Sequence, residues 1–408
     1  MAELQVLDVR LYGQTIGTLT RLPGDRILFA FDDAYIADAA RPTFGLSFKD
    51  AYGALLTEFK PTQTRLPPFF ANLLPEGAMR GYLAAKAGVN PAREFFLMWV
   101  LGRDLPGALE IVAADGEPSL PDEAHPSSDG AHGTAEDAIL RFSLAGVQLK
   151  FSAIKDAKGG LTIPANGMGG SWIVKLPSTM FEGVPENEFA MMELARRVGI
   201  DVPQTELVPL EAIKGLPRAM ERLDSQAFAI RRFDRAANGG KIHIEDFAQV
   251  FGVYPDDKYK NASYRSIAEV LWIETGEAGI VEFIRRFVFN ALIGNGDMHL
   301  KNWSLIYPDR RNAQLAPAYD FVSTIGYMPN ETLALNFQGS KRFDDLTYDR
   351  FAGFAAKAGL PEHITLQTAR QTVADFRAAW QGSGDLAIRP VVRNAIDELL
   401  PAIPIWTA

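Results

Sequence analysis

The chain has 408 residues, enough for roughly two or three packed units with a large hydrophobic core. Its 47 % hydrophobic and 22 % charged residues are ordinary for a globular protein, and the absence of cysteine excludes disulfides, thiol catalysis and cysteine-ligated zinc. The five histidines are scattered and the formal net charge is −9, which argues against a histidine-built metal site and against nucleic-acid binding through the overall field.

The first 113 residues predict a small α/β module. Alternating β-rich segments separated by glycine-containing turns within residues 4–30 are typical of an antiparallel sheet. Helical periodicity follows at Gly77–Ala87 and Arg93–Leu101. Residues 114–137 then shift to Pro, Gly, Ser, Asp and His, which predicts a flexible linker.

Beyond the linker, residues 138–235 predict a β-rich lobe with one helix. Gly199 is placed to end this helix. The expected strands are Ile139–Phe151, Gly160–Ile163, Ser171–Leu176, Glu206–Leu210 and Phe228–Phe233, and the helix is Pro185–Val198.

Residues 236–408 predict a mainly helical lobe, because apolar residues recur there at three- and four-residue intervals. The expected helices are Tyr264–Trp272, Gly279–Leu292, Leu346–Ala358 and Leu366–Trp380. A β-rich half that leads into a helical half favours an α+β, two-lobed protein-kinase-like fold, here preceded by the small amino-terminal module.

No targeting signal is expected. The first residues, MAELQVLDVRLYG, show no basic start and no apolar run of signal-peptide type. No window approaches 18 uncharged apolar residues, so we expect no transmembrane helix and a cytoplasmic location.

The most informative segment is GNGDMHLKN at residues 294–302. It places Asp297 five positions before Asn302, and Asp320 follows 18 positions later within APAYDFVS at 316–323, which we expect to be an apolar strand. Phosphoryl transfer needs one carboxylate to orient the attacking hydroxyl, and an amide and a second carboxylate to hold magnesium. Asn-Gly and Asp are also common turn formers, so a purely structural loop is the alternative. For His299, a structural tie within the loop is as compatible with the sequence as a role at the nucleotide.

Lys175 ends the apolar strand segment WIVK and resembles the strand lysine that neutralises nucleotide phosphates in kinases. An edge lysine that discourages strand pairing is the alternative. Glu186 and Glu188 on the next helix offer ion-pair partners. We expect Glu188 to be the partner, because Glu186 falls in the first helical turn, where it matches the helix dipole.

A segment with small residues, FSLAGVQLK at residues 142–150, joins the linker to a strand. Small side chains let backbone N–H groups approach a phosphate, as in an anion-binding nest. Phosphate on Ser143 would add charge beside such a site and could disturb it.

Together these motifs resemble the HipA-type serine/threonine-protein kinases, the toxins of bacterial type II toxin–antitoxin modules. Further matches in the correct order cover nearly the whole chain. They are LPPFFANLLPEG at 66–77, GRD and GA within 102–108, IVKLP at 173–177, ENE at 186–188, RFDR at 232–235 and EDF at 245–247.

The resemblance implies ATP- and magnesium-dependent transfer to a protein hydroxyl. It would make Asp297 the catalytic base, Asn302 and Asp320 the metal ligands, and Ser143 a site of inhibitory autophosphorylation. The expected nucleotide-binding residues are Lys175, His299, the phosphate-loop residues Ala145, Gly146, Val147 and Gln148, and the hinge residues Arg232 and Phe233. This chain departs from the family pattern at Leu149 and Arg232.

The resemblance also implies partners: a protein substrate, with aminoacyl-tRNA synthetases among the targets of the family, and a small helix-turn-helix antitoxin of HipB type that supplies the DNA contact. Two other functions stay open. One is a small-molecule phosphotransferase, which uses a similar Asp, His and Asn loop. The other is an inactive kinase-like corepressor that acts through its DNA-binding antitoxin.

Overall fold

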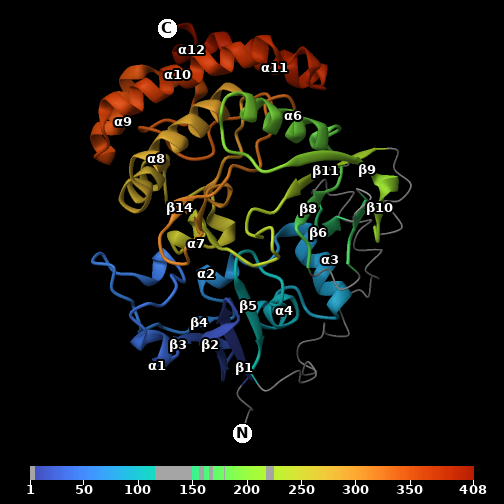
Figure 1. The fold of residues 1–408 in the computed structure, drawn as a ribbon, viewed down its shortest axis with the longest axis vertical. Coiled ribbons are helices and arrows are strands. Elements are labelled where there is room, and N and C mark those ends of the chain that lie inside the picture. Colours follow the sequence, from blue (N-terminus) through green and yellow to red (C-terminus); the bar gives the residue numbers. More distant parts are fainter. Residues whose placement is uncertain (1–4, 115–148, 156–159, 165–168, 179, 217–224) are drawn as a thin grey trace.

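The structure is a computed structural model that describes residues 5–114, 149–155, 160–164, 169–178, 180–216 and 225–408. Three sheets and a group of helices follow one another along the described chain. Figure 1 shows the amino-terminal sheet at one end of the molecule and the carboxy-terminal helices at the other. The described helices include none that is long and apolar enough to cross a bilayer.

The amino-terminal module is built on a five-stranded sheet in the order β4-β3-β2-β1-β5, antiparallel throughout. Residues of β1 alternate between buried and half-buried, which aims one face at a phenylalanine-rich core. The strands are β1 (Gln5–Leu11), β2 (Gln14–Leu22), β3 (Arg26–Phe31), β4 (Thr62–Gln63) and β5 (Leu109–Ala113). The helices are α1 (Asp33–Ala37), α2 (Pro68–Ala71), α3 (Gly77–Ala87) and α4 (Glu94–Leu101).

A six-stranded mixed sheet, in the order β10-β7-β6-β8-β11-β9, forms the next layer. Its strands are β6 (Lys150–Lys155), β7 (Leu161–Thr162), β8 (Trp172–Lys175), β9 (Thr205–Pro209), β10 (Ile213–Lys214) and β11 (Gln226–Arg231). Helix α6 (Val184–Arg197) packs on β9 and β11. The strand expected at Ile139–Phe151 lies largely outside the described residues, and its described end belongs to β6.

Helix α3 joins the module to this sheet. Its residues Met79 and Tyr82 belong to the same buried cluster as Phe151 and Val174 of the sheet. The rings of Tyr82 and Phe151 meet edge to face, with their centroids 5.9 Å apart. The module and the β-rich lobe therefore share a hydrophobic core.

The carboxy-terminal lobe is mainly helical and has the largest core. Its helices are α7 (Phe247–Val250), α8 (Tyr264–Leu292), α9 (Tyr348–Ala358), α10 (Glu362–Gln381), α11 (Pro390–Leu399) and α12 (Pro404–Thr407). Non-helical angles at Gly276 divide α8, in agreement with the two helices expected there. A small sheet, β12 (His243–Asp246), β13 (Ser304–Tyr307) and β14 (Gln314–Leu315), lies beside the segment of residues 294–302.

Seven short 3-10 helices complete the described elements: Leu46–Phe48, Leu210–Ala212, Pro255–Asp257, Leu300–Asn302, Phe343–Asp345, Ser383–Asp385 and Leu400–Ala402. The predicted α+β, two-lobed kinase-like fold with an amino-terminal module is confirmed. The domain boundaries proposed from the sequence stay a prediction.

Candidate active site

The segment with Asp297 leaves the buried end of α8 through a tight glycine turn. Gly294 has φ +63°, and a Cβ there would lie 2.4 Å from Ile325 Cδ1, so the turn requires glycine. The Asn295 Oδ1 atom then accepts a hydrogen bond from the Asp297 N–H at 3.0 Å. Asp297 is exposed while residues 286–296 and 298–300 are buried, so this rigid loop presents one carboxylate to the surface.

Tyr259 contacts this carboxylate directly. Its hydroxyl donates a hydrogen bond to Asp297 Oδ1, and its ring meets the His299 ring edge to face at 5.0 Å. Loss of hydration beside the packed loop raises the pKa of Asp297, although the bond from Tyr259 works in the opposite direction. Burial lowers the pKa of His299 to about 3, so this ring is neutral at physiological pH.

Asp320 lies between two other expected site residues. Its Oδ1 atom is 2.5 Å from Lys175 Nζ, and its Oδ2 atom accepts a hydrogen bond from Asn302 Nδ2 at 2.6 Å. Burial would raise the pKa of Asp320, but Lys175 reverses the effect and keeps it well below the usual range. The strand expected around Asp320 is wrong: the segment is irregular and Asp320 has φ +63°. The apolar neighbours that suggested a strand pack into the core of the helical lobe instead.

Lys175 reaches a second carboxylate on α6. Its Nζ atom lies 2.5 Å from Glu188 Oε1, and Glu188 is completely buried. Burial raises the pKa of Glu188 to about 7, and the positive charge of Lys175 limits the rise. Burial alone would lower the pKa of Lys175, whereas the two carboxylates raise it overall. The lysine therefore stays charged where nucleotide phosphates would need it.

The residues around Asp320 fit a magnesium ion. Asn302 Oδ1 is buried and has no hydrogen-bond partner among the described residues. Within the same residues, no group of three His, Cys, Asp or Glu could hold a metal ion. Magnesium commonly takes one or two protein oxygens and completes its shell with water and substrate phosphates. Asn302 and Asp320 can supply such a pair.

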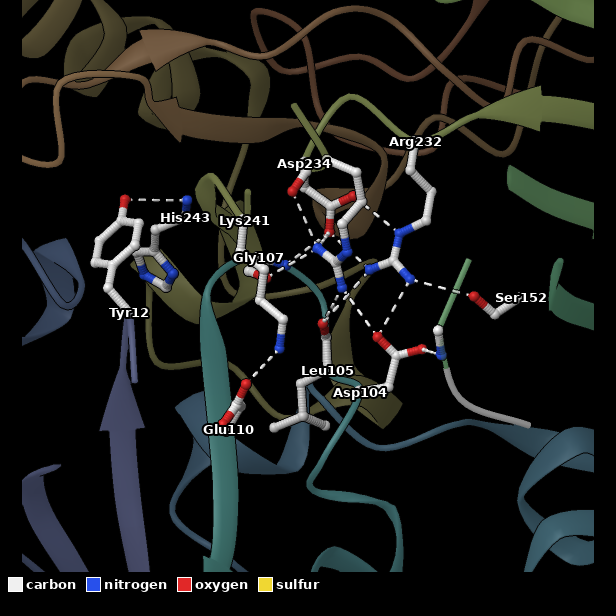
Figure 2. Close-up of polar contacts among 12 residues, drawn as sticks. Tyr12, Asp104, Leu105, Gly107, Glu110, Ser152, Arg232, Asp234, Lys241 and His243 are labelled. Atoms are coloured by element: carbon white, nitrogen blue, oxygen red, sulfur yellow. Dashed lines mark hydrogen bonds and ion pairs between the residues drawn. The ribbon is translucent and has the colours of Figure 1, made fainter. Parts of the chain in front are cut away.

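The hinge differs from a simple adenine-contacting strand (Figure 2). The Arg232 side chain is buried and donates to Asp234, with Nε 2.9 Å from Oδ1 and Nη2 2.8 Å from Oδ2. The Arg232 N–H already donates to Ser171 O at 2.8 Å. Phe233 packs on Tyr319, with ring centroids 5.7 Å apart. The Arg232 side chain thus holds the hinge through Asp234, and nucleotide binding by Arg232 and Phe233 stays a prediction.

The phosphate-loop residues Ser143, Ala145, Gly146, Val147 and Gln148 lie outside the described residues. The chain is described again from Leu149, whose carbonyl accepts a hydrogen bond from Leu176 N at 2.9 Å. Lys150 is the register partner of Lys175 in the antiparallel pair β6 and β8. The loop therefore re-enters the sheet directly beside Lys175.

Sequence reasoning missed two contributions to the site. One is Tyr259, which nothing in its surrounding sequence marks. The other is Glu76 of the amino-terminal module, which binds Lys301 Nζ at 2.6 Å and Lys258 Nζ at 3.0 Å. These two lysines lower the pKa of Glu76 to about 2 in spite of its burial. The motif around Glu76 is recognisable in the sequence, but its contacts with Lys258 and Lys301 are not.

The fold and the site define a two-lobed, protein-kinase-like protein. Comparison with known families assigns residues 7–112 to the HipA N-terminal domain and residues 142–380 to the HipA-like C-terminal domain. The chain therefore belongs to the HipA family.

Similar proteins support the assignment to this family. A Sinorhizobium fredii protein with the name "Putative kinase Y4dM" is 56 % identical and covers 100 % of this chain and 99 % of its own. The serine/threonine-protein kinase toxin HipA of Shewanella oneidensis is 26 % identical over 75 % of this chain and 74 % of its own. A solved HipA–HipB–operator DNA complex from that organism contains a chain with the same fold, with TM-score 0.73 and 22 % identity over 97 % of this chain and 96 % of the other.

Proposed function

We propose that this chain is an ATP- and magnesium-dependent serine/threonine protein kinase and the toxin of a toxin–antitoxin pair with a HipB-type, DNA-binding antitoxin. The observation that carries the proposal is the position of Asp320, whose two carboxylate oxygens meet Lys175 and Asn302. Kinases need a phosphate-binding cation and a metal-binding amide around such a carboxylate.

In this reaction, Asp297 receives or orients the proton of the attacking hydroxyl. Its Oδ1 atom is bound by Tyr259, and Oδ2 accepts no hydrogen bond from a described residue, which leaves this oxygen for the acceptor. Lys175 neutralises phosphate charge and is itself held by Glu188. Asn302 and Asp320 would hold magnesium, which neutralises the charge that develops on the transferred phosphoryl group.

Two features favour a protein acceptor over a small metabolite. Asp297 is exposed at the surface of the loop, where a folded partner can reach it. The chain is also related along most of its length to a serine/threonine-protein kinase toxin. Aminoacyl-tRNA synthetases are the proposed class of target, and autophosphorylation of Ser143 is the proposed form of self-inhibition.

The test is incubation of the purified full chain with labelled ATP and magnesium, with casein as an added acceptor. We expect label on serine or threonine of casein or of the chain itself, with Ser143 among the labelled sites. Asp297→Asn should remove at least about 99 % of the transfer. The matched control is Asp309→Asn, because Asp309 is an exposed turn residue on the same lobe. Full transfer by Asp297→Asn would reject the mechanism.

A further inference from the structure

Two charged segments that the proposed transfer mechanism does not use meet at the boundary between the amino-terminal module and the hinge (Figure 2). One is the loop 102–107 between α4 and β5, and the other is RFDR at 232–235 after β11. Asp104 Oδ1 lies 3.0 Å from Arg235 Nη2 and 3.6 Å from Arg232 Nη1. Both arginines also bind Asp234 at 2.8 Å.

Backbone groups of the same loop complete the contact. The Gly107 N–H donates to Asp234 Oδ2 at 2.8 Å, and the Gly107 carbonyl accepts from Arg235 Nη1 at 3.0 Å. Gly107 has φ +75°, and a Cβ there would lie 2.8 Å from Ile244 N, so no other residue fits without strain. The Leu105 carbonyl accepts from both arginines.

The four charges form a balanced, buried cluster, which we call the hinge clamp: Asp104, Arg232, Asp234 and Arg235. Their side chains are only 6 to 11 % exposed. The two arginines keep the pKa of Asp234 below its usual value in spite of burial. Because an unpaired charge is costly to bury, loss of one carboxylate forces the two segments to move apart or to admit water.

The hinge clamp touches the nucleotide site from two sides. On one side, the clamped segment includes Phe233, which packs on Tyr319, the neighbour of Asp320. On the other, Asp104 Oδ2 accepts a hydrogen bond from Gly169 N at 2.7 Å. Gly169 lies shortly before β8, the strand that carries Lys175.

We propose that Asp104 is a positioning residue for the nucleotide, through which the amino-terminal module fixes the hinge relative to the lysine strand. This inference rests on the proposed kinase function. Asp104 touches no nucleotide in this scheme. It acts through Arg232, Arg235 and the backbone before β8, so its loss weakens nucleotide binding more than it slows the transfer step.

The test compares two variants at the same boundary, Asp104→Asn and Glu110→Gln. Glu110 pairs with Lys241 at 2.8 Å, but these side chains are 34 % and 26 % exposed and lie outside the hinge clamp. Calorimetric titration of the full chain with Mg-ADP should show that Asp104→Asn binds at least roughly tenfold more weakly than the unmodified chain. Glu110→Gln should bind as the unmodified chain does. At saturating ATP, the transfer rate of Asp104→Asn should stay within about twofold of the unmodified chain.

Arg235→Gln removes the other end of the contact and should weaken Mg-ADP binding in the same way. If Asp104→Asn does not fold, the Mg-ADP affinity of Arg235→Gln decides the question. Unmodified affinity in a folded Asp104→Asn or Arg235→Gln variant overturns the positioning role. An equal fall in Mg-ADP affinity for Glu110→Gln also overturns it, because the effect would then follow from the loss of any charge at this boundary. Failure of the unmodified chain to bind Mg-ADP would instead reject the proposed function.

Discussion

Replacing Lys175 with methionine should destabilise the β-rich lobe, because it removes the cation from two carboxylates and keeps the aliphatic stem. The Nζ atom lies 2.5 Å from an oxygen of Glu188 and of Asp320, and the lysine is itself buried. Removing one partner of a buried ion pair costs about 3–5 kcal/mol in free energy of unfolding. We expect a loss in this range near neutral pH.

The pH dependence follows from Glu188. Its pKa is about 7 with Lys175 beside it, so without the lysine the pKa rises further above the unfolded value. A carboxyl group whose pKa is higher in the folded protein than in the unfolded chain costs no stability below the pKa of the unfolded chain, because it is protonated in both states there. The free energy of unfolding then falls as the pH rises through the pKa of the folded protein. The loss caused by Lys175→Met should therefore be smaller at about pH 5 than at about pH 8.

Urea unfolding followed by tryptophan fluorescence measures this loss, since Trp172 lies on the same strand. Lys155→Met is the matched control, because Lys155 pairs with Glu206 on the same sheet with both side chains more than a quarter exposed. Its loss should be below about 1 kcal/mol. Lys175→Met/Glu188→Gln should recover part of the stability. Equal losses for the two lysine variants, or a loss that grows as pH falls, would refute the reasoning.

Two further predictions concern the loop that carries Asp297. Tyr259→Phe removes the hydrogen bond that lowers the pKa of Asp297, so the acidic limb of the pH–rate profile for label transfer should move to higher pH. Tyr254→Phe, on the same segment, should leave this limb in place, and an unmoved limb in both variants contradicts the prediction. Gly294→Ala should cost at least about 1 kcal/mol in urea unfolding, because of its positive φ and the contact with Ile325. Ile325→Ala should relieve part of that cost, and full additivity of the two changes would argue against a clash.

The sequence predicted most elements that depend on local periodicity. Turn residues and apolar spacing alone predict the antiparallel sheet at the amino terminus and the helices α3 and α4. They also predict two helices where Gly276 divides α8. Strands β12, β13 and β14 were missed, since they are only two to four residues long. Short segments of this kind are defined by their partners in the fold.

In the candidate site too, local sequence predicts some features and the tertiary fold alone determines others. Spacing placed Asp297, Asn302 and Asp320 in one region, and the structure brings Asn302 and Asp320 into contact. The path of the chain at Asp320 could not be predicted, because apolar residues that pack on helices resemble a buried strand. The contact between Asp104 and Arg235 joins positions 131 residues apart, and only the tertiary fold reveals it.

The shared core beneath α3 has a consequence for biosynthesis. Met79 and Tyr82 leave the ribosome well before the strands that bury them, since Ala229 of the same cluster follows roughly 150 residues later. At about 5–20 residues per second, this apolar face remains without its sheet for roughly 8–30 s. The nascent amino-terminal module is therefore exposed to aggregation or chaperone binding during this interval. A slower translation rate across residues 149–229 should lengthen it and lower the yield of folded protein.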